Sequence, residues 1–335
     1  MQYTCFIGVD VSKRQLDIAC LQNEKPVHFY ACKNDEASVT TAFKKMFAEL
    51  HLEIEQTLIC AEHTGHYSNI LTNCMVKYGY QFWLESPYQI SKSQGIQRGK
   101  SDQVDAERIA IYARRFSDKA SLVRPSNTCV EGLSYLASER SLLMADLAKY
   151  KSQITDHKMF INKLLFKERE KRLNALIKLL HKQIKAIEQQ MDLLVLQDET
   201  LKKQLSLLLS IDGIGKQVAF NMLIATKAFT KFETARKFAC YIGVAPFQYS
   251  SGTSIRSAKR VSKQANQKLK SLVHMAALSV IQKQGELRDY YTRKVSEGKN
   301  KMSVINAVRA KLISRMFAVI NSNKEYEKKY SIALV

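Results

Sequence analysis

The chain has 335 residues, of which 46% are hydrophobic and 25% are charged, and its formal net charge is +21. These proportions are those of a globular protein and exclude a largely disordered chain. The length suffices for two or three domains. No run of 18 apolar residues is present, which excludes a membrane-spanning helix. The N-terminal segment lacks the basic and apolar regions of a signal peptide, so we expect a cytoplasmic protein.

The positive charge is concentrated toward the C-terminus. Residues 201–335 contain 25 Lys and Arg against 7 Asp and Glu, a surplus of 18, which leaves a surplus of 3 for residues 1–200. Solubility does not require one sign of charge on one segment, whereas binding of a polyanion does. We therefore expect residues 201–335 to bind nucleic acid. The seven cysteines are scattered singly, which predicts neither a zinc site nor a disulfide framework.

The first part of the chain predicts an α/β domain with a mixed sheet. Residues 3–34 contain three short β-branched or aromatic segments separated by turn residues, which indicates three strands. Helical and strand patterns then alternate, as expected for such a domain. The predicted elements are a helix at 37–50, a strand at 57–62, a helix near 67–78, a strand at 81–86 that Pro87 ends, and a helix that Asp102 opens.

Residues 130–200 predict two long helices. Apolar residues recur there at alternating spacings of four and three, as in a coiled-coil seam. The clearest seam consists of Leu173, Ile177, Leu180, Ile184, Ile187, Met191 and Leu194. The charged KEREKR stretch at 167–172 is predicted to separate the two helices. The seam suits an intermolecular coiled coil and an intrachain antiparallel hairpin equally.

The segment 207–225 resembles a helix–hairpin–helix element. A hydrophobic helix is followed by Gly213-Ile214-Gly215 and then by a second helix. In such elements the glycine turn and the helix N-terminus present backbone N–H groups to a phosphate. The segment YIGVAPFQYSSGTSIRSAKRVSKQANQKL at 241–269 then supplies a loop rich in Ser, Gly, Arg and Lys, followed by helical sequence. A single glycine pair is weak evidence, but this one lies in the most basic part of the chain.

Four carboxylates lie at the ends of predicted elements. Asp10 ends a strand in FIGVDVSK, and Glu62 ends another in TLICAEHTG. Asp102 and Asp105 are three apart at a helix start, so they face one side of the first turn. Any one of these acids alone would suit a surface charge, and Asp102 would suit a helix N-cap. Together they are the ligands that two hard cations holding a scissile phosphate require.

The sequence blocks resemble a known family, the DEDD transposases of the IS110 type and the related Piv DNA invertases. FIGVDVSK, AEHTG and KSDQVDAERIA match the three N-terminal blocks of that family in order and approximate spacing. SIDGIGKQVA, ACYIGVAP and the SG…RVSKQAN stretch match its C-terminal domain. The resemblance covers nearly the whole chain, and residues 120–200 are the least distinctive. It identifies the chain as a recombinase of a bacterial insertion sequence.

The resemblance implies three domains. A RuvC-like, ribonuclease H-type α/β domain is expected at 1–120, a helical coiled-coil domain at 121–200, and a mainly α-helical transposase domain at 201–335. Asp10, Glu62, Asp102 and Asp105 would form the metal-binding tetrad, and a serine of the last domain would form a covalent bond to DNA. The family also implies a structured noncoding guide RNA that pairs with donor and target DNA. Because recombination joins two DNA sites, we expect a dimer or tetramer.

Ser251, which precedes Gly252, best matches the nucleophile position of the family, and neighbouring Ser254 and Ser250 remain alternatives. Because Ser251 is far along the chain from the four acids, the predicted site is composite. Several residues would contact phosphate groups of nucleic acid. These are Lys100, Gly213, Gly215, Arg256, Lys259, Arg260 and Lys263.

Two other functions fit the same residues. A RuvC-like nuclease would use the four carboxylates to hydrolyse DNA with water and would have no serine step. A basic nucleic-acid-binding protein would use the acids structurally and the coiled coil for assembly. Mg²⁺-dependent strand cleavage separates the two enzymes from the binding protein. A covalent adduct between protein and DNA separates the recombinase from the nuclease.

Overall fold

The structure is a computed structural model, and it consists of two compact units, Met1–Pro125 and Ser126–Val335. It describes residues 3–22, 27–93, 95, 101–125, 127–247, 250–251, 255–256, 260–261 and 265–327. For residues 250, 251, 255, 256 and 260 it describes the backbone and not the side chain. None of the helices in these ranges is both long and apolar enough to span a membrane.

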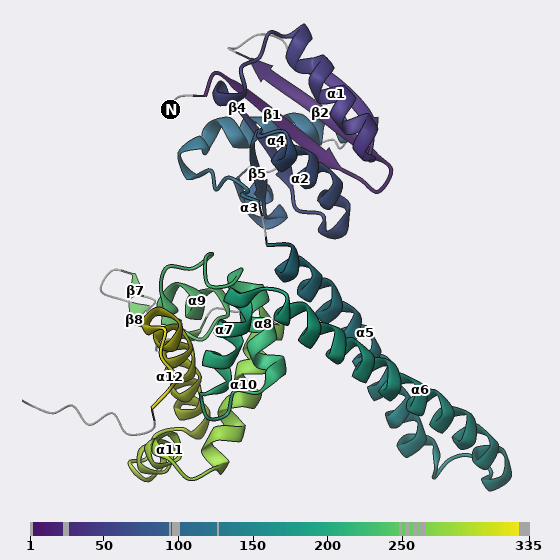
Figure 1. The fold of residues 1–335 in the computed structure, drawn as a ribbon, viewed down its shortest axis with the longest axis vertical. Coiled ribbons are helices and arrows are strands. Elements are labelled where there is room, and N and C mark those ends of the chain that lie inside the picture. Colours follow the sequence, from purple (N-terminus) through teal and green to yellow (C-terminus); the bar gives the residue numbers. More distant parts are fainter. Residues whose placement is uncertain are drawn as a thin grey trace, which may run out of the picture. The chain divides into compact units, whose positions relative to one another are not determined.

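The first unit is built on a five-stranded sheet with the order β3-β2-β1-β4-β5 (Figure 1). The strands are β1 Cys5–Val11, β2 Gln15–Gln22, β3 His28–Lys33, β4 Thr57–Glu62 and β5 Gln81–Glu85. β2 runs antiparallel to both of its neighbours, β1 and β3, whereas β1, β4 and β5 run parallel to one another. The strands β1 and β4 are buried on both faces and therefore consist almost entirely of apolar residues.

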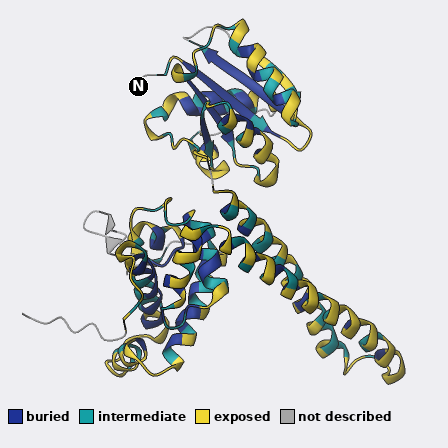
Figure 2. Cartoon of the chain, viewed as in Figure 1, coloured by how far each residue is buried: buried dark blue, intermediate teal, exposed yellow. Residues whose placement is uncertain are grey.

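Helices cover both faces of this sheet. One face packs against α1 (Glu36–Glu49) and α2 (Ser68–Lys77), and the opposite face packs against α3 (Pro87–Ser93) and α4 (Asp102–Arg115). The sheet is accordingly dark blue in Figure 2, and the outer surfaces of the helices are exposed. Single turns of 3₁₀ helix complete the unit at Ile54–Gln56, Gly65–Tyr67 and Ser117–Lys119. The mixed α/β architecture predicted from the sequence is confirmed.

Two expectations concern the boundaries of elements in this unit, and the second needs correction. The sequence predicted that Pro87 ends a strand, but it is also the first residue of α3, a position where its missing N–H costs nothing. Asp102 was a candidate N-cap of the following helix, yet the structure gives that role to Ser101, whose side chain accepts from the Val104 N–H. Asp102 is the first residue inside the helix, and capping does not account for it.

The second unit begins with two long antiparallel helices, α5 (Thr128–His157) and α6 (Lys163–Leu196). Arg140 on α5 donates to Glu188 on α6 at 2.7 Å, and pairs nearer each end of the helices follow the same antiparallel register. The predicted seam lies along this contact, and four of its residues are buried: Leu173, Ile184, Ile187 and Met191. The seam is thus used within the chain, as an intrachain hairpin requires, and self-association stays a prediction.

The boundary between the two helices was predicted wrongly. KEREKR at 167–172 lies inside α6, and the chain turns earlier, at residues 158–162. Lys, Glu and Arg are good helix formers, so a run of alternating charges does not end a helix. The true start of α6 has a local cause, because the Asn162 side chain accepts from the Leu164 N–H and caps the helix.

Within the described part of the second unit, six further helices and four very short strands follow the hairpin. The helices are α7 Glu199–Leu209, α8 Lys216–Thr226, α9 Ala235–Tyr241, α10 Gln267–Gln282, α11 Glu286–Ser296 and α12 Lys301–Ser322. The strands pair as β6 Pro246–Phe247 with β9 Arg260–Val261, and β7 Ser250–Ser251 with β8 Ile255–Arg256. One apolar core joins the base of the α5–α6 hairpin to these helices. The predicted three-domain division therefore stays a prediction.

Candidate active site

One face of the sheet carries a row of carboxylates beside α4. Successive residues of a strand point to opposite faces, so Asp10 lies on the same face as Phe6 and Gly8. That face is the one covered by α4, because Phe6 packs in the same core as Ile109 of the helix. In β4, Leu58 and Cys60 belong to this core, which places Glu62 on the same face.

Strand register brings these acids next to one another. Val9 pairs with Ala61, so Asp10 and Glu62 follow as neighbours at the ends of two adjacent parallel strands. On the other side of Asp10, the antiparallel register places Asp17 of β2 directly opposite. Beyond Glu62, its partner in β5 is Glu85. Four adjacent strands therefore each contribute one carboxylate to the same face.

Helix α4 adds two more carboxylates by crossing the sheet in direct contact with β1. A Cβ atom on Gly8 would lie 2.1 Å from the backbone oxygen of Ala106, so only glycine permits this approach. Asp102 and Asp105 are in the turn of the helix that ends at Ala106. Because Gly8 and Asp10 are on the same face of one strand, the crossing holds the start of α4 close to Asp10.

The electrostatics of Asp10 reflect this crowding. Its pKa rises from 3.8 to about 6, first because the side chain is partly buried and then because Asp105, Asp102, Glu62 and Asp17 repel its charge. The sequence-predicted acids are therefore close enough to interact. A raised pKa of this kind marks a site where extra positive charge would be stabilising.

Three polar neighbours of the row were not predicted. Arg108 donates to Asp105 at 2.7 Å, and Gln15 donates to both oxygens of Asp17 at 2.9 and 3.1 Å. The Tyr112 hydroxyl donates to Glu85 at 3.3 Å, which anchors that carboxylate to α4. Asp17 and Glu85 could not be found from sequence, since only the strand register reveals that they lie beside Asp10 and Glu62.

The donors suit a hard divalent cation, because they are all carboxylate oxygens. Among the residues that the structure describes, no three acidic, imidazole or thiol groups are closed around one metal position. Binding of a divalent cation would therefore require the carboxylates to move closer together. The charge of the cation would offset the repulsion between them. The residues predicted to hold the metal are Asp10, Glu62, Asp102 and Asp105, and the last three all lie close enough to Asp10 to raise its pKa.

The predicted nucleophile lies in the second unit. Ser250 and Ser251 form β7, and Ser251 pairs with Ile255 in β8. Arg256 and Arg260 are in β8 and β9, where the backbone alone is described. Ser254, Lys100, Lys259 and Lys263 lie outside the described residues. The roles of all these residues stay predictions.

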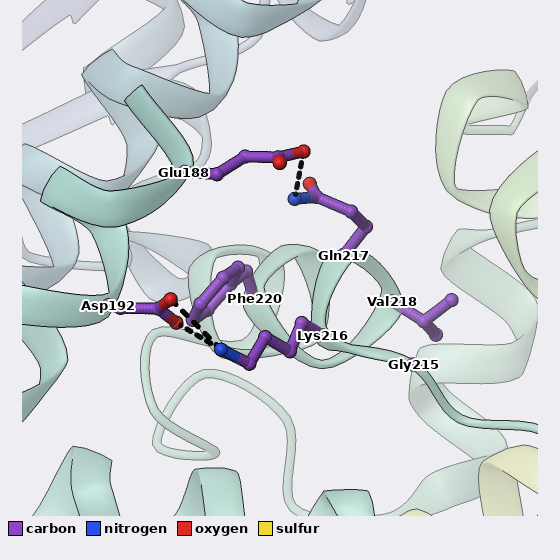
Figure 3. A pocket seen from close by; sticks show the side chains of 7 residues that line it. All are labelled: Glu188, Asp192, Gly215, Lys216, Gln217, Val218 and Phe220. Carbon is purple, nitrogen blue, oxygen red and sulfur yellow. Dashed lines mark hydrogen bonds and ion pairs between the residues drawn. The ribbon is translucent and has the colours of Figure 1, made fainter. Parts of the chain in front are cut away.

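The two glycines of the predicted phosphate-binding turn precede α8. Gly213 has a packing reason to be glycine, because its φ is +87° and a Cβ would lie 2.8 Å from the Cβ of Val280. Gly215 is the N-cap of α8 and has open space around it. Beside it lies a cavity of about 350 Å³ lined by side chains of α6 and α8 (Figure 3).

This cavity is lined by two carboxylates and one lysine, so its lining is not a basic surface. Asp192 accepts from Lys216 at 2.9 Å, and Glu188 accepts from Gln217 at 3.1 Å, so both carboxylates of α6 face the start of α8 (Figure 3). Carboxylates at a helix N-terminus compensate its positive dipole. The positive dipole at the N-terminus of α8 is therefore already compensated within the chain. A phosphate contact by Gly213 and Gly215 stays a prediction.

Comparison with known proteins gives matches over both units. A model of DEDD transposases of the IS110 type, described as "Transposase", matches residues 7–161. A second model, described as "Transposase IS116/IS110/IS902 family", matches residues 205–292. The first match contains Asp10, Glu62, Asp102 and Asp105, and the second contains Ser250, Ser251 and Ser254.

Individual relatives agree with these matches. The chain is 26% identical to the "Pilin gene-inverting protein" of Moraxella bovis, over 97% of this chain and 98% of that protein. It is 23% identical to the protein of the same name from Moraxella lacunata, over the same shares of the two chains. An "Insertion element IS110 uncharacterized 43.6 kDa protein" of Streptomyces coelicolor is 30% identical over 44% of this chain and 36% of its own.

Proposed function

Because the chain belongs to the IS110 family of transposases and is therefore a DNA transposase or recombinase, we propose that it cuts and rejoins DNA through a covalent serine–DNA intermediate. The observation that carries the cleavage step is the row of carboxylates on one sheet face, with Asp102 and Asp105 of α4 beside Asp10. The serine step rests on the resemblance of the segment around Ser251 to the family. A mixed sheet covered by helices on both faces, with acids at the ends of its central strands, supports a RuvC-like, ribonuclease H-type domain.

Asp10, Glu62, Asp102 and Asp105 would hold Mg²⁺, two ions by the family resemblance. When bound, Mg²⁺ supplies positive charge that stabilises the phosphate and favours ionisation of the attacking hydroxyl. Arg108, bonded to Asp105, and Gln15, bonded to Asp17, would keep two of the neighbouring carboxylates in fixed orientations. Gly8 has a positioning role, because its missing side chain lets α4 lie on β1.

Ser251 would supply the nucleophile. Its oxygen bonds to the DNA phosphorus while the bond from phosphorus to one deoxyribose oxygen breaks. The serine loses its proton, and the released deoxyribose oxygen gains one and becomes a hydroxyl. Rejoining reverses these changes with a second hydroxyl, so the energy of the ester is conserved and no external energy source is needed.

A denaturant-resistant adduct tests the serine step. Wild type incubated with DNA and Mg²⁺ should give an adduct that maps to Ser251. Ser251→Ala should still bind DNA, because one hydroxyl contributes little to a large charged interface, but it should form no adduct. Ser279→Ala, an exposed serine on α10, is the matched control and should react as wild type does. An adduct at Ser254 or Ser250 would reassign the nucleophile, and cleavage without any adduct would support the RuvC-like nuclease instead.

The proposal includes a guide RNA and self-association. The surplus of 18 positive charges in residues 201–335 supports binding of nucleic acid, and the family resemblance supports RNA as a second ligand beside DNA. Large apolar side chains near the turn between α5 and α6 are highly exposed, from 71% to 84%, namely Met159, Phe160, Leu164 and Leu165. Exposed apolar surface of this kind supports assembly into a dimer or tetramer. Sequencing of copurified RNA and sedimentation of the complex test these two parts, and a cytoplasmic location belongs to the same proposal.

A further inference from the structure

A cluster of basic side chains lies between α10 and α12, apart from the carboxylates. Lys270 and His274 are four residues apart on α10, and Asn306 and Arg309 are three apart on α12, so each pair shares one helix face. Arg309 is only 7% exposed. One of its terminal nitrogens lies 2.7 Å from His274 Nδ1, and the other donates to Asn306 Oδ1 at 3.3 Å. The guanidinium is thereby fixed between the two helices.

Arg309 has no anionic partner among the described residues. It forms no ion pair there, and its Nε–H is buried without a hydrogen-bond acceptor. Neither α10 nor α12 contains an Asp or Glu residue. Glu286 on α11, between these helices in sequence, pairs instead with Arg315. A buried guanidinium without a carboxylate is costly, because it has lost water and gained no opposite charge.

The neighbours of Arg309 add to this deficit of negative charge. A guanidinium only donates, so His274 Nδ1 must accept, and the imidazole is neutral with its proton on Nε2. Burial and then the charge of Arg309 lower the pKa of both Lys270 and His274, and burial lowers the pKa of Arg309 itself. An anion in contact with Arg309 and Lys270 would supply the missing negative charge and offset the repulsion between the two side chains.

The cluster lies at the base of the segment that contains the serines. Asn306, which accepts from Arg309, also donates to the backbone oxygen of Val244 at 2.9 Å, two residues before β6. At the other end of the segment, the Asn266 N–H donates to the Tyr241 backbone oxygen at 3.2 Å. Asn266 is the N-cap of α10, one turn before Lys270. Both ends of residues 245–265 are therefore attached close to the basic cluster.

We propose that Arg309 and Lys270 bind the phosphate group of the DNA strand that the enzyme cleaves, with His274 and Asn306 as positioning residues for the Arg309 guanidinium. A phosphate fits because it is a compact anion whose oxygens can accept from a terminal N–H of Arg309 and from the ammonium group of Lys270 at once. The inference rests on the proposed function in taking the serine segment as the place of cleavage, and it names the side chains that hold the substrate there.

Ethylation interference tests this contact without requiring cleavage. Duplex DNA that spans one end of the insertion sequence is ethylated at about one phosphate per molecule, which removes the charge of that phosphate. The copurified RNA is ethylated separately in the same way. Full-length protein then selects the molecules that still bind. We expect ethylation of the phosphate at the strand-exchange point to weaken wild-type binding about tenfold, the scale of one charge-assisted contact. In Arg309→Gln this single interference signal should disappear while all others persist.

Two further variants make the result interpretable. Arg315→Gln removes the same charge from the same helix, and it should keep the interference signal, because Arg315 pairs with Glu286. Lys270→Gln changes a partly exposed side chain, so the fold should survive even if Arg309→Gln destabilises the unit, and it should weaken the same signal. At saturating DNA, strand cleavage by Arg309→Gln should be about a hundredfold slower than wild type.

The outcomes separate the proposed phosphate site from the proposed serine mechanism. Unchanged interference in both Arg309→Gln and Lys270→Gln would overturn the phosphate site, as would a lost signal that maps to the RNA or to a distant DNA phosphate. If the signal at the exchange point is lost as expected but no serine adduct forms, the phosphate site stands and the serine mechanism fails.

Discussion

Replacing Asp10 with asparagine should stabilise the metal-free protein while abolishing its activity. The folded-state pKa of Asp10 is about 6, above its ordinary value of 3.8, so the folded state holds this proton more tightly than the unfolded state does. Ionisation of Asp10 therefore opposes folding. The penalty develops as pH rises from about 4 to about 6 and is complete above that range. The asparagine amide would keep the shape of the side chain without the charge.

The size of the effect follows from the pKa difference. A rise from 3.8 to about 6 corresponds to at most about 3 kcal/mol at 1.36 kcal/mol per pKa unit. Because the side chain is only partly buried, solvent screening reduces this to about 1–2 kcal/mol. At pH 8 in EDTA, Asp10→Asn should unfold at a urea concentration roughly 1 M higher than wild type. The difference should shrink as the pH is lowered toward about 4.

The chain contains its own probe for this measurement. Trp83 is the single tryptophan, lies in the first unit, is 2% exposed and packs 5.2 Å from the Tyr112 ring of α4. Its fluorescence should report unfolding of the first unit within the full-length protein. Asp118→Asn, at an exposed carboxylate outside the row, is the matched control and should leave the unfolding midpoint unchanged.

Mg²⁺ should make wild type more stable than Asp10→Asn, the reverse of the order expected in EDTA. At a concentration 100 times its dissociation constant, a ligand that binds only the folded state stabilises it by about 2.7 kcal/mol. Wild type should gain this stabilisation, and Asp10→Asn should gain much less. If Asp10→Asn is less stable than wild type in EDTA at pH 8, the repulsion argument is wrong. If Mg²⁺ stabilises both proteins equally, Asp10 is not a metal ligand.

Three further predictions concern packing, assembly and charge. Gly8→Ala should destabilise the first unit by about 3 kcal/mol, measured by Trp83 fluorescence, because the added Cβ would lie 2.1 Å from the Ala106 oxygen; an unchanged midpoint would refute the close crossing of α4. Ile187→Asp, in the core at the hairpin base, should unfold the second unit in circular dichroism, whereas Leu165→Asp near the turn should keep the fold and reduce the sedimentation coefficient of any oligomer. A fragment of residues 126–335 should bind nucleic acid with a steep dependence on salt, and equal binding by residues 1–125 at the same ionic strength would contradict the charge argument.

The four acids could be proposed from the sequence because each lies at the end of a strongly patterned element. Asp10 and Glu62 follow short apolar segments, and Asp105 lies in the first turn of an amphipathic helix. Asp17 and Glu85 escaped notice because cross-strand register depends on tertiary pairing, which leaves no local pattern. Gly8 was likewise invisible, since its importance comes from a backbone contact with a helix about a hundred residues further along the chain.

The errors in the second unit have a different origin. The charged run at 167–172 was interpreted as a break, although its residues favour helix, and the capping Asn162 was the better signal. The basic cluster was overlooked because residues 270 and 309 are separated by a whole helix, α11. Residues chosen for phosphate contacts were those near the serines in sequence. The structure instead brings Arg309, far from them in sequence, to the base of their segment through Asn306.

The two units differ in the sign of the charge that lacks a partner. Asp10 and its neighbours repel one another already, so a phosphate approaching them without metal would meet further repulsion. In the second unit it is a positive charge that is unpaired, because the buried Arg309 lacks any negative partner among the described residues. A DNA phosphate could bind Arg309 of the second unit directly, but it could approach the carboxylates of the first unit only when a cation lies between them. Binding energy should therefore come mainly from residues 201–335, and metal dependence from residues 1–120. Charge changes at other Lys and Arg residues of the second unit should then alter DNA affinity and its salt dependence, whereas changes to the four acids should alter the rate at saturating DNA. Arg309 is proposed to contact the cleaved phosphate, so its replacement should alter both the affinity and the rate.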